Sequence, residues 1–596
     1  MAPKLAWLAV LVPNLWCQSE QQIRKAAGLA IPTLERSASG FVNKRGCVSC
    51  HHNILPVLLL PMARERGFAV DDAVVDAVEQ KTFRDLRASS AVDDAIQGAH
   101  LNDPTPNDSF LLMAANAAGF EPGLITAIYA RRLAAWQRDG HWVTSDFRPP
   151  HSSSMFTATA SAIRAIRLYM PAELRSEADA CLARARQWLA ANKPVSTEDA
   201  SFRVMGLVWA GAAASEWNAA RQDLLKLQSL GGGWPQLPRY EPDAYSTGEA
   251  LFALRGTGMP TAEPAFRGGL KFLLSTQARD GSWHVRTRMV SPARVSPQYF
   301  TTGFPYAKDE YISYAGSSWA VLALLASLPE SGARPREQRV LEGEKSPDWV
   351  RTALFGTAGE LTSLLDAGLD PNSQTAKGAT LLMMAAPDPA KVRLLLARGA
   401  RATTRAPSGS DALTIASTYR GTAEAIRLLL DAGADVQPPK GVHTNQSPLL
   451  LAAMTGDLEN VRLLLSRGAD PSFAPSPQAG TPLASAVTFG YTEIVRTLIQ
   501  AGASATITES SGINLLHWAV IANRPAVIPA LIEAGVSLNA VDESGYTPIM
   551  YAATIDFGDS ESLRILRQAG ADPTIRNFEG RNATQQARRY LHSMLR

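Results

Sequence analysis

The feature that most constrains the fold of this chain is a glycine that recurs at a nearly constant interval through its C-terminal part. Each glycine ends a leucine-rich segment, and successive glycines are 31, 34, 35, 34, 33 and 35 residues apart: Gly368, Gly399, Gly433, Gly468, Gly502, Gly535 and Gly570. A repeat of this length is typical of a solenoid in which each unit is one supersecondary structure. A glycine directly after a helix readily adopts the left-handed C-cap conformation. We therefore expect stacked units, each with a helix that ends at its glycine.

Short motifs mark where the first helix of several units begins. They read Ser447-Pro448-Leu449, Thr481-Pro482-Leu483, Asn514-Leu515-Leu516-His517-Trp518-Ala519 and Thr547-Pro548-Ile549. Proline in the first helical turn removes no helical hydrogen bond. The motifs resemble the Thr-Pro-Leu-His-x-Ala start of the ankyrin repeat family, whose unit is about 33 residues long. The resemblance implies a solenoid over 348–596 with short β-hairpin loops, made of seven units and a polar cap from Arg581 to Arg596. It implies a protein partner bound through hairpin tips and inner helices, with His517 as a structural residue.

A second repeat precedes the first and is marked by a glutamine followed by a glycine-x-tryptophan turn. The three copies end at Trp142, Trp234 and Trp283, which are 92 and 49 residues apart, and their glutamines are Gln137, Gln228 and Gln277. The longer interval has room for one degenerate copy near Gln187-Trp188, so the period is about 47 residues, within the range of stacked helical units. Helical segments rich in small residues lie between the turns. Two helices per unit predict an α/α arrangement.

These turns resemble the QW motifs of the terpene cyclase and protein prenyltransferase superfamily of α/α toroids. The resemblance implies a toroid over 101–328, starting at about residue 100, whose glutamines and tryptophans are structural and whose cavity could hold a small apolar ligand, either isoprenoid or polysaccharide-like. The Asp-x-Asp-Asp acid of the cyclases is absent from the chain. A prenyltransferase-type zinc site could be assembled only from Asp179, Cys181 and His284, and the first two lie on a helix directed away from the cavity. No catalytic residue is therefore assigned.

Acidic residues occur where inner helices of such a toroid would begin. Asp243 and Glu249 belong to one such segment, and Asp309 and Glu310 to another. A cavity site could use these carboxylates. Aspartate is also a favoured helix N-cap, and acids near helix N-termini are stabilised by the helix dipole. Capping is the interpretation we prefer for them.

The sequence Cys47-Val48-Ser49-Cys50-His51 has the Cys-x-x-Cys-His spacing that attaches a c-type haem. Cys47 and Cys50 would bind the vinyl groups, and His51 would be the axial ligand of the haem iron. Met62 is a possible second axial ligand, but it is 11 residues further on, about 16 Å along a straight helix. Other candidates for that ligand are His100, His141, His151, Met113 and Met155, and the iron could also be five-coordinate. The alternatives are a Cys47–Cys50 disulfide and a zinc site made by the two cysteines with one or both of His51 and His52.

The N-terminus resembles a secretory signal peptide over residues 1–19. Lys4 precedes an apolar run from Leu5 to Val12, Pro13 ends the run, and Ser19 follows as a small residue at a cleavage position. We therefore expect export to a periplasmic or extracellular compartment. No later segment has the 18 or so uninterrupted apolar residues of a membrane span. A net charge of +3 from 58 basic and 55 acidic residues gives no reason to expect a nucleic acid partner.

Together these patterns predict an all-α protein, an α/α toroid followed by an ankyrin solenoid. The expected divisions are a signal peptide at 1–19, a helical segment with the cysteine motif at 20–100, the toroid at 101–328, a linker at 329–347 and ankyrin repeats at 348–596. The leading hypothesis is an exported protein-binding scaffold with a covalent haem, used for electron transfer or redox sensing. The alternatives are a toroid enzyme related to terpene cyclases and a haem-free interaction scaffold.

The haem hypothesis makes a direct spectroscopic prediction. Protein produced in a periplasm with haem-attachment machinery and then denatured should retain a haem absorbance band, because thioether bonds survive unfolding. Cys50→Ala should abolish the band. An intact wild-type protein without any band would exclude covalent attachment.

Overall fold

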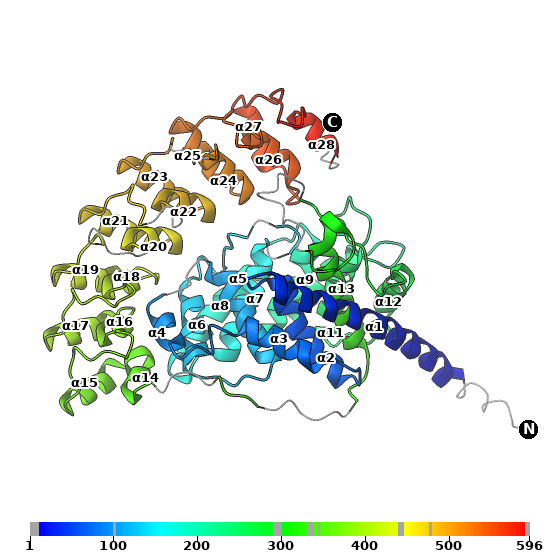
Figure 1. The fold of residues 1–596 in the computed structure, drawn as a ribbon, viewed down its shortest axis with the longest axis horizontal. Coiled ribbons are helices and arrows are strands. Elements are labelled where there is room, and N and C mark those ends of the chain that lie inside the picture. The colour runs from blue at the N-terminus through cyan, green and yellow to red at the C-terminus, as the bar shows by residue number, and fades with distance from the viewer. Residues whose placement is uncertain are drawn as a thin grey trace, which may run out of the picture.

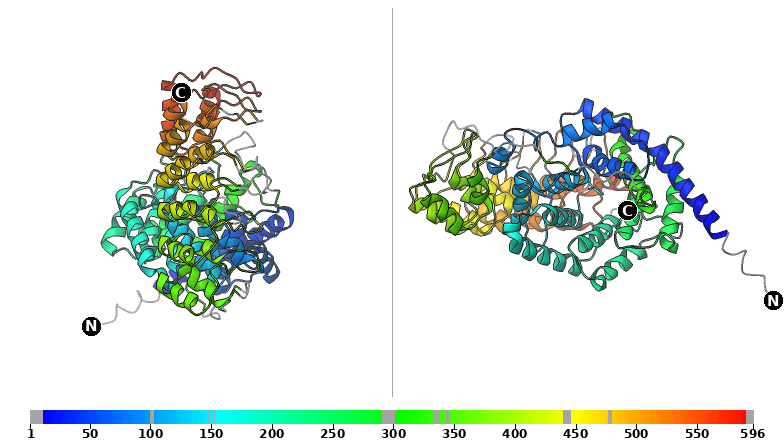
Figure 2. Two further views of the ribbon diagram at one scale, coloured as in Figure 1. Left: turned by 90° about the vertical axis from the view of Figure 1, so that its left-hand side faces the viewer. Right: turned by 90° about the horizontal axis from the view of Figure 1, so that it is seen from below.

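The computed structural model describes residues 11–98, 103–146, 148–151, 153–289, 301–331, 338–341, 346–438, 446–475, 480–506, 508–509 and 511–589, with the backbone alone at 11–19, Cys50 and 588–589. Within these ranges the secondary structure is helical, and isolated bridges take the place of strands. The predicted all-α class is confirmed. The helices form two parts, a broad N-terminal group and a curved C-terminal double row that lies against it (Figures 1 and 2).

The N-terminal part is a closed ring of helices, which we call the helical ring. Each inner helix packs against the next one and the last packs against the first: α2 (Leu55–Glu65), α5 (Pro104–Ala117), α7 (Met155–Tyr169), α9 (Thr197–Trp209), α11 (Ala244–Gly256) and α13 (Glu310–Ser327). An outer row surrounds them: α1 (Leu11–Lys44), α3 (Asp72–Thr82), α6 (Leu124–Ala135), α8 (Arg175–Ala191), α10 (Ala214–Lys226) and α12 (Pro264–Thr276). The short helix α4 (Ala91–Ile96) packs on α6.

The ring includes the segment that we expected to stand apart from it. Helix α2 lies between α13 and α5 in the inner row, and α1 packs on α13. Residues 20–98 therefore belong to the ring, so the expected division between a separate helical segment and the toroid is not observed. Proline usually interrupts a helix, but α1 continues through Pro32 and α2 continues through Pro61. The lost hydrogen bonds of these prolines are offset by burial of both helices in the ring.

The glutamine–tryptophan turns connect the outer helices to one another. Each tryptophan is buried, and its indole N–H donates to a carbonyl near the end of the preceding outer helix: Trp142 to Leu133 at 2.7 Å, Trp234 to Leu224 at 2.8 Å and Trp283 to Leu273 at 2.9 Å. Each glutamine amide donates to a carbonyl on the next outer helix: Gln137 to Cys181 at 2.8 Å, Gln228 to Ala265 at 2.8 Å and Gln277 to Ala26 at 2.9 Å. The last of these bonds joins α12 to α1 and closes the outer row. The suspected fourth copy is not a turn, since Trp188 lies within α8 and stacks on His141.

The C-terminal part is a row of helix pairs, which we call the ankyrin array. Its inner row comprises α14 (Asp348–Phe355), α16 (Leu381–Ala385), α18 (Ala412–Ala416), α20 (Pro448–Thr455), α22 (Pro482–Phe489), α24 (Leu515–Ile521), α26 (Pro548–Thr554) and α28 (Ala583–Arg589). Its outer row comprises α15 (Ala358–Asp366), α17 (Pro389–Ala397), α19 (Ala423–Asp431), α21 (Leu458–Ser466), α23 (Thr492–Gln500), α25 (Ile528–Glu533) and α27 (Glu561–Gln568). The seven repeating glycines follow the outer helices with φ between 81° and 102°, as predicted. His517 is buried and bonds Asn514 and the Tyr546 carbonyl, which is a structural role.

The inner row of the array faces the helical ring and contacts it (Figure 1). The Arg131 guanidinium donates to the Leu354 carbonyl at 2.6 Å, and the Trp136 indole donates to the Thr418 carbonyl at 3.0 Å. Further along, Tyr240 donates to the Asp556 carboxylate at 2.8 Å. The surface that ankyrin arrays commonly present to partners is thus in contact with the chain's own N-terminal part.

Ring closure can be tested at Gly281, the glycine of the third turn. Its φ is +87°, and a Cβ at this position would overlap the Leu29 carbonyl of α1. Gly281→Ala should therefore add steric overlap to the cost of a left-handed alanine, each about 1–3 kcal/mol, and lower the melting temperature. Gly258→Ala is the matched control, because Gly258 has φ +80° and open space around it. Equal melting temperatures for the two variants would contradict close packing of this turn on α1.

Candidate functional site

The six inner helices run in the same direction, so their N-terminal ends meet at one end of the ring. His51 precedes α2, His151 precedes α7 and Tyr311 lies in the first turn of α13. The His51 ring centroid is 6.1 Å from that of His151 and 5.8 Å from that of Tyr311. Helix N-termini carry partial positive charge, which favours acidic groups at this end. We call the buried group here the polar floor; it comprises His51, His151, Glu198, Tyr245, Glu249, Arg288 and Tyr311.

A hydrogen-bonded chain runs through the polar floor. The Tyr245 hydroxyl lies 3.1 Å from Nδ1 of His151 and donates to Glu198 over 3.3 Å. Thr157 donates to the other oxygen of Glu198 at 2.6 Å. Because Tyr245 donates to Glu198, its oxygen accepts from His151 Nδ1–H, which leaves Nε2 of this neutral imidazole as an acceptor. Nε2 is buried and has no hydrogen-bond partner among the described residues.

Burial shifts the acid–base properties of these groups. It raises the pKa of Glu198 to about 7. It raises the pKa of Glu249 well above its usual value, and the nearby Glu198 carboxylate raises it further. Burial also lowers the pKa of His51 and of His151. These shifts favour the neutral forms of the two histidines and of Glu249.

Arg288 supplies the positive charge next to these acids. It is 5% exposed, and its Nε and Nη1 atoms are buried without hydrogen-bond partners among the described residues. Its charge lowers the pKa of both Glu198 and Asp243, although burial outweighs this effect in each case. Its main-chain carbonyl accepts from the amide of Asp556 at 3.1 Å. The same residue thus belongs to the polar floor and contacts the last repeats of the ankyrin array.

An apolar cavity of about 500 Å³, which we call the bore, occupies the interior of the ring towards the C-terminal ends of the inner helices. Residues from all six inner helices line it, including Met62, Phe110, Met113, Phe202, Trp209, Phe252 and Trp319. Phe202 and Phe252 follow Glu198 and Glu249 by four and three residues, so each aromatic shares a helix face with an acid. The Phe110 ring centroid lies 6.3 Å from that of His151. The bore and the polar floor are therefore neighbours along the ring axis, joined through Phe110, although no residue of the polar floor lines the bore itself.

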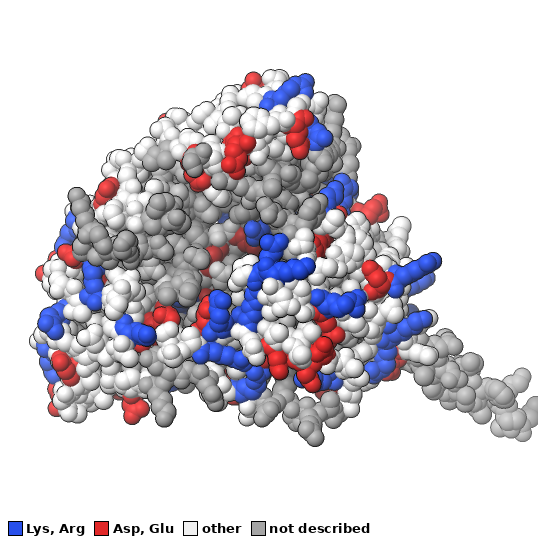
Figure 3. Space-filling model, viewed as in Figure 1, with Lys and Arg blue, Asp and Glu red and all other residues white. Residues whose placement is uncertain are grey.

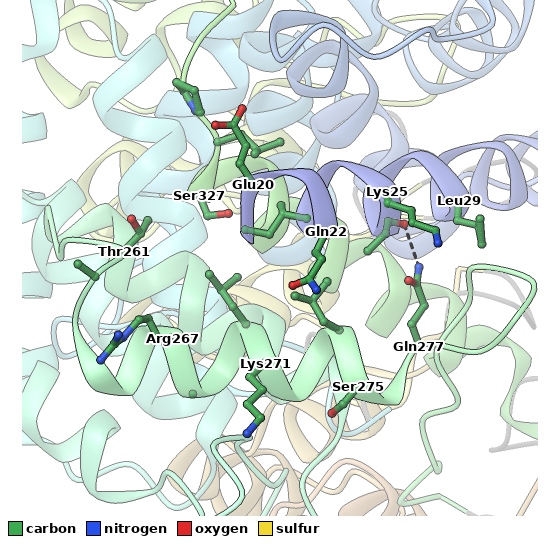
Figure 4. Close-up of a pocket in the computed structure, with 18 of the residues that line it drawn as sticks. Glu20, Gln22, Lys25, Leu29, Thr261, Arg267, Lys271, Ser275, Gln277 and Ser327 are labelled. Atoms are coloured by element: carbon green, nitrogen blue, oxygen red, sulfur yellow. Dashed lines mark hydrogen bonds between the residues drawn. The ribbon is translucent and has the colours of Figure 1, made fainter. Parts of the chain in front are cut away.

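A larger hollow, of about 960 Å³, lies outside the ring between α1 and α12 (Figure 4). Lys25, Arg267 and Lys271 are among its lining residues, and the Gln277 bond to α1 marks one end of it. None of its lining residues belongs to the polar floor. Across the face seen in Figure 3, acidic and basic side chains are interspersed. No described helix is both long enough and apolar enough to cross a membrane.

The cysteine motif lies at the polar-floor end of the ring, because His51 is part of both. His52 stacks between Phe41 and Tyr314, with ring centroids 4.9 and 4.0 Å away. His51 is 6% exposed, whereas Cys47 is an exposed free thiol, and the Cys50 side chain lies outside the described residues. The alternative Cys47–Cys50 disulfide is therefore not formed.

The packing of His51 can be compared with what a haem requires. A c-type haem places both sulfurs and the axial imidazole against one flat cavity. The His51 imidazole is enclosed by four rings at centroid distances of 4.8 to 6.5 Å: Phe41, His52, His151 and Tyr311. The Cys47 thiol faces solvent instead. As packed, these residues do not fit a covalent haem.

The other candidate ligands are dispersed. Met62 and Met113 line the bore, His141 stacks on Trp188, Met155 is 36% exposed, and His100 lies outside the described residues.

Cys181 is buried in α8 while Asp179 is exposed there. His284 bonds Asp309 at 3.0 Å. No group of three metal-ligating side chains occurs among the described residues, so the site considered from Asp179, Cys181 and His284 is not assembled. The zinc site considered at the cysteine motif includes Cys50, whose side chain lies outside the described residues.

The acids singled out from the sequence divide into two roles. Asp243 caps α11 by accepting from the Ser246 amide at 2.9 Å, as expected. Glu249 is fully buried in the polar floor. Sequence reasoning missed Glu198, Tyr245 and Arg288. The available signal for Glu198 and Tyr245 was their position in the first turn of inner helices, where side chains on one face point towards the ring axis.

Comparison with known proteins identifies the C-terminal part. A family model for ankyrin repeats matches three times, at residues 351–440, 437–509 and 486–577. The putative ankyrin repeat protein YahD of Escherichia coli (strain K12) is 30% identical over 187 residues, 30% of this chain and 90% of that protein. This chain belongs to the ankyrin repeat family. SH3 and multiple ankyrin repeat domains protein 1 of Mus musculus is 32% identical over 139 residues, 23% of this chain and only 6% of that protein. Palmitoyltransferase Hip14 of Drosophila melanogaster is 35% identical over 103 residues, 17% of this chain and 16% of that protein.

The buried acid of the polar floor predicts a specific pH dependence. A carboxyl group whose pKa is raised by folding contributes stability below its unfolded value of about 4.5, and this contribution is lost as pH rises towards the folded value. Glu249→Gln removes the titrating group. The variant should therefore become more stable relative to wild type as the pH rises from 5 to 8, by up to about 1.4 kcal/mol of unfolding free energy per pH unit. The difference between the two melting temperatures, measured at each pH, reports this change.

The exposed Glu241 provides the control for this measurement. Glu241→Gln should keep a constant difference from wild type across the same range. The buried histidines are unchanged in both variants, so their contribution cancels in the comparison. A Glu249→Gln difference that does not change with pH would show that Glu249 is not held protonated by burial.

Proposed function

We propose that the helical ring binds an elongated apolar ligand in the bore, and that the ankyrin array holds the ring and adds a protein-binding surface. The observation that carries this proposal is the bore itself. It is lined from six helices by aromatic and aliphatic side chains, and its few polar lining residues lie towards the C-terminal ends of these helices. Cavities of about 300–1,000 Å³ with this distribution are typical ligand sites.

The chemical character of the lining distinguishes between the two ligand classes, isoprenoid and polysaccharide-like, that the resemblance to α/α toroids implied. A polysaccharide needs many hydrogen-bonding side chains along its length, whereas the middle of the bore presents Phe202, Phe252 and Trp319. This supports an isoprenoid-like or other hydrocarbon chain. Glu249 lies on α11 one turn before Phe252, which lines the bore, and we propose it as the group that could donate a proton to the inner end of such a chain. An enzyme of this kind would use glutamates in place of the absent Asp-x-Asp-Asp acid.

Binding in the bore can be tested by blocking its entrance. Gly256 ends α11 and lines the bore, and no heavy atom lies within 4 Å of the place that a Cβ would take there, so Gly256→Trp should fill the entrance without displacing the backbone. Farnesol and hexadecanol should quench or shift the fluorescence of Trp209 and Trp319 in wild type. The variant should weaken binding by about tenfold or more, since a blocked cavity cannot bury the chain.

Gly359→Trp, on helix α15 of the ankyrin array, is the matched control, because Gly359 is also a helical glycine with open surroundings. It should bind both alcohols like wild type. Wild-type protein that binds neither alcohol would refute the proposal, and so would a Gly256→Trp variant with unchanged affinity.

A protein partner is a second candidate function, supported by the exposed hairpin tips of the last repeats. Phe578 is 78% exposed and Val541 is 45% exposed. The hairpins that carry them are joined by a bond from the Phe578 amide to the Ser544 carbonyl at 3.1 Å. Exposed aromatic side chains are common anchors of protein interfaces. Because the inner row contacts the ring, we place the partner on these tips.

Haem attachment at Cys47, Cys50 and His51, with electron transfer or redox sensing, remains a prediction of the sequence, as does export. The enclosed packing of His51 supports the haem-free alternative instead. Residues 1–10 of the expected signal peptide lie outside the described residues, and the backbone from Leu11 onwards belongs to α1.

A further inference from the structure

The outer end of the bore carries three arginines whose charges are only partly compensated by the protein. We propose that this end binds the carboxylate head of a long-chain fatty acid whose hydrocarbon tail occupies the bore. The inference rests on the proposed function of the bore and adds the chemical class of the ligand. Arg66, Arg164 and Arg255 all line the cavity, and they come from helices α2, α7 and α11.

Arg66 is the most deeply placed of the three. It is 8% exposed, and its Nε donates to the Leu325 carbonyl at 3.2 Å, which fixes the plane of the guanidinium. Its Nη1 is buried and has no hydrogen-bond partner among the described residues. Its Nη2 lies 3.5 Å from Glu330, whose side chain is 81% exposed, and a pair this exposed contributes little. A buried guanidinium with an unused N–H is costly unless a ligand completes its hydrogen bonds.

The other two arginines are held at the same opening. Arg164 lies with its guanidinium carbon 5.9 Å from the Trp209 ring centroid, and its pKa is lowered by burial and by Arg167. Arg255 donates to the Ala326 carbonyl at 3.1 Å. No ion pair to a carboxylate is formed by either Arg164 or Arg255 among the described residues. Both guanidinium groups therefore retain charge that an anion could neutralise.

The charge balance favours a head group with a single negative charge. Glu65 also lines the opening, and Glu330 pairs weakly with Arg66. Among the described residues at this opening, three arginines and two glutamates leave a net charge of +1. A carboxylate matches this charge and can accept two parallel N–H bonds from one guanidinium. A phosphate dianion carries two negative charges, one more than this net positive charge. The apolar lining beyond the arginines, which includes Leu58, Phe252 and Leu322, suits one unbranched chain.

The position of the arginines also agrees with the polarity of the ring. The bore opens where the inner helices end, because Glu65, Ala117, Trp209, Gly256 and Ala326 are at or near their last residues. Helix C-termini carry partial negative charge and would repel a carboxylate by themselves. Cationic side chains at this end are consequently required for an anionic head, and neutral ligands would not need them.

The test compares ligands that share a chain and differ in the head. Hexadecanoate, hexadecanol and hexadecyl phosphate are titrated into the full-length protein, with tryptophan fluorescence or calorimetry as the readout. Wild type should bind hexadecanoate about tenfold or more tightly than hexadecanol, the ratio expected of one charge-assisted hydrogen bond. Arg66→Gln and Arg164→Gln should each lose this ratio and bind hexadecanol as wild type does.

Arg167→Gln is the control, since Arg167 is exposed on the same helix as Arg164 and does not line the bore. It should keep the wild-type ratio. Equal affinities of wild type for hexadecanoate and hexadecanol would overturn the carboxylate proposal while leaving the bore as an apolar site. Tighter binding of hexadecyl phosphate than of hexadecanoate would also overturn it. Failure of every ligand to bind would refute the bore proposal itself.

Discussion

The hydrogen bond from the Gln277 amide to the Ala26 carbonyl is the contact on which the arrangement of this protein depends. It joins the last outer helix of the ring to the first, and Gly281 allows the turn to approach the backbone of α1. Closure places α2, which follows α1, in the inner row between α13 and α5. The polar floor and the bore both require this closure, because each takes residues from α2 or from the segment that precedes it.

The electrostatics of the site follow from the common direction of the inner helices. Helix N-termini meet at the polar floor, where they favour acids, and helix C-termini meet at the outer end, where arginines are found. At the floor, burial dominates over the dipoles, because it raises the pKa of Glu198 to about 7 in spite of Arg288 nearby. The ring thus has buried carboxyl groups of raised pKa at one end and cationic side chains at the other, where they line the apolar cavity of about 500 Å³.

The local repeats could be predicted from the sequence, but the contacts between segments that are far apart in the chain could not. The glycines of the ankyrin array form a regular pattern because each unit is completed by its nearest neighbours, and the array could be recognised unit by unit. The ring closes between Ala26 and Gln277, 251 residues apart, which no local pattern encodes. For the same reason Glu249 was noticed as an acid on an inner helix, whereas its neighbours Glu198 and Arg288 were missed. The cysteine motif illustrates the opposite error, since a specific local pattern suggested a haem while the fold encloses His51 among aromatic rings.

The contact between array and ring gives the two parts a physical link at the site. The carboxylate of Asp556 accepts hydrogen bonds from Arg239 and Tyr240, and its amide donates to the carbonyl of Arg288. Asp556 follows α26, one helix pair before the end of the array, so a partner held at the Phe578 hairpin would act one repeat away from it. Repeat arrays transmit displacement mainly between adjacent units. Movement of the last repeats would consequently act directly on the contacts that Asp556 makes with Arg239, Tyr240 and the main-chain carbonyl of Arg288.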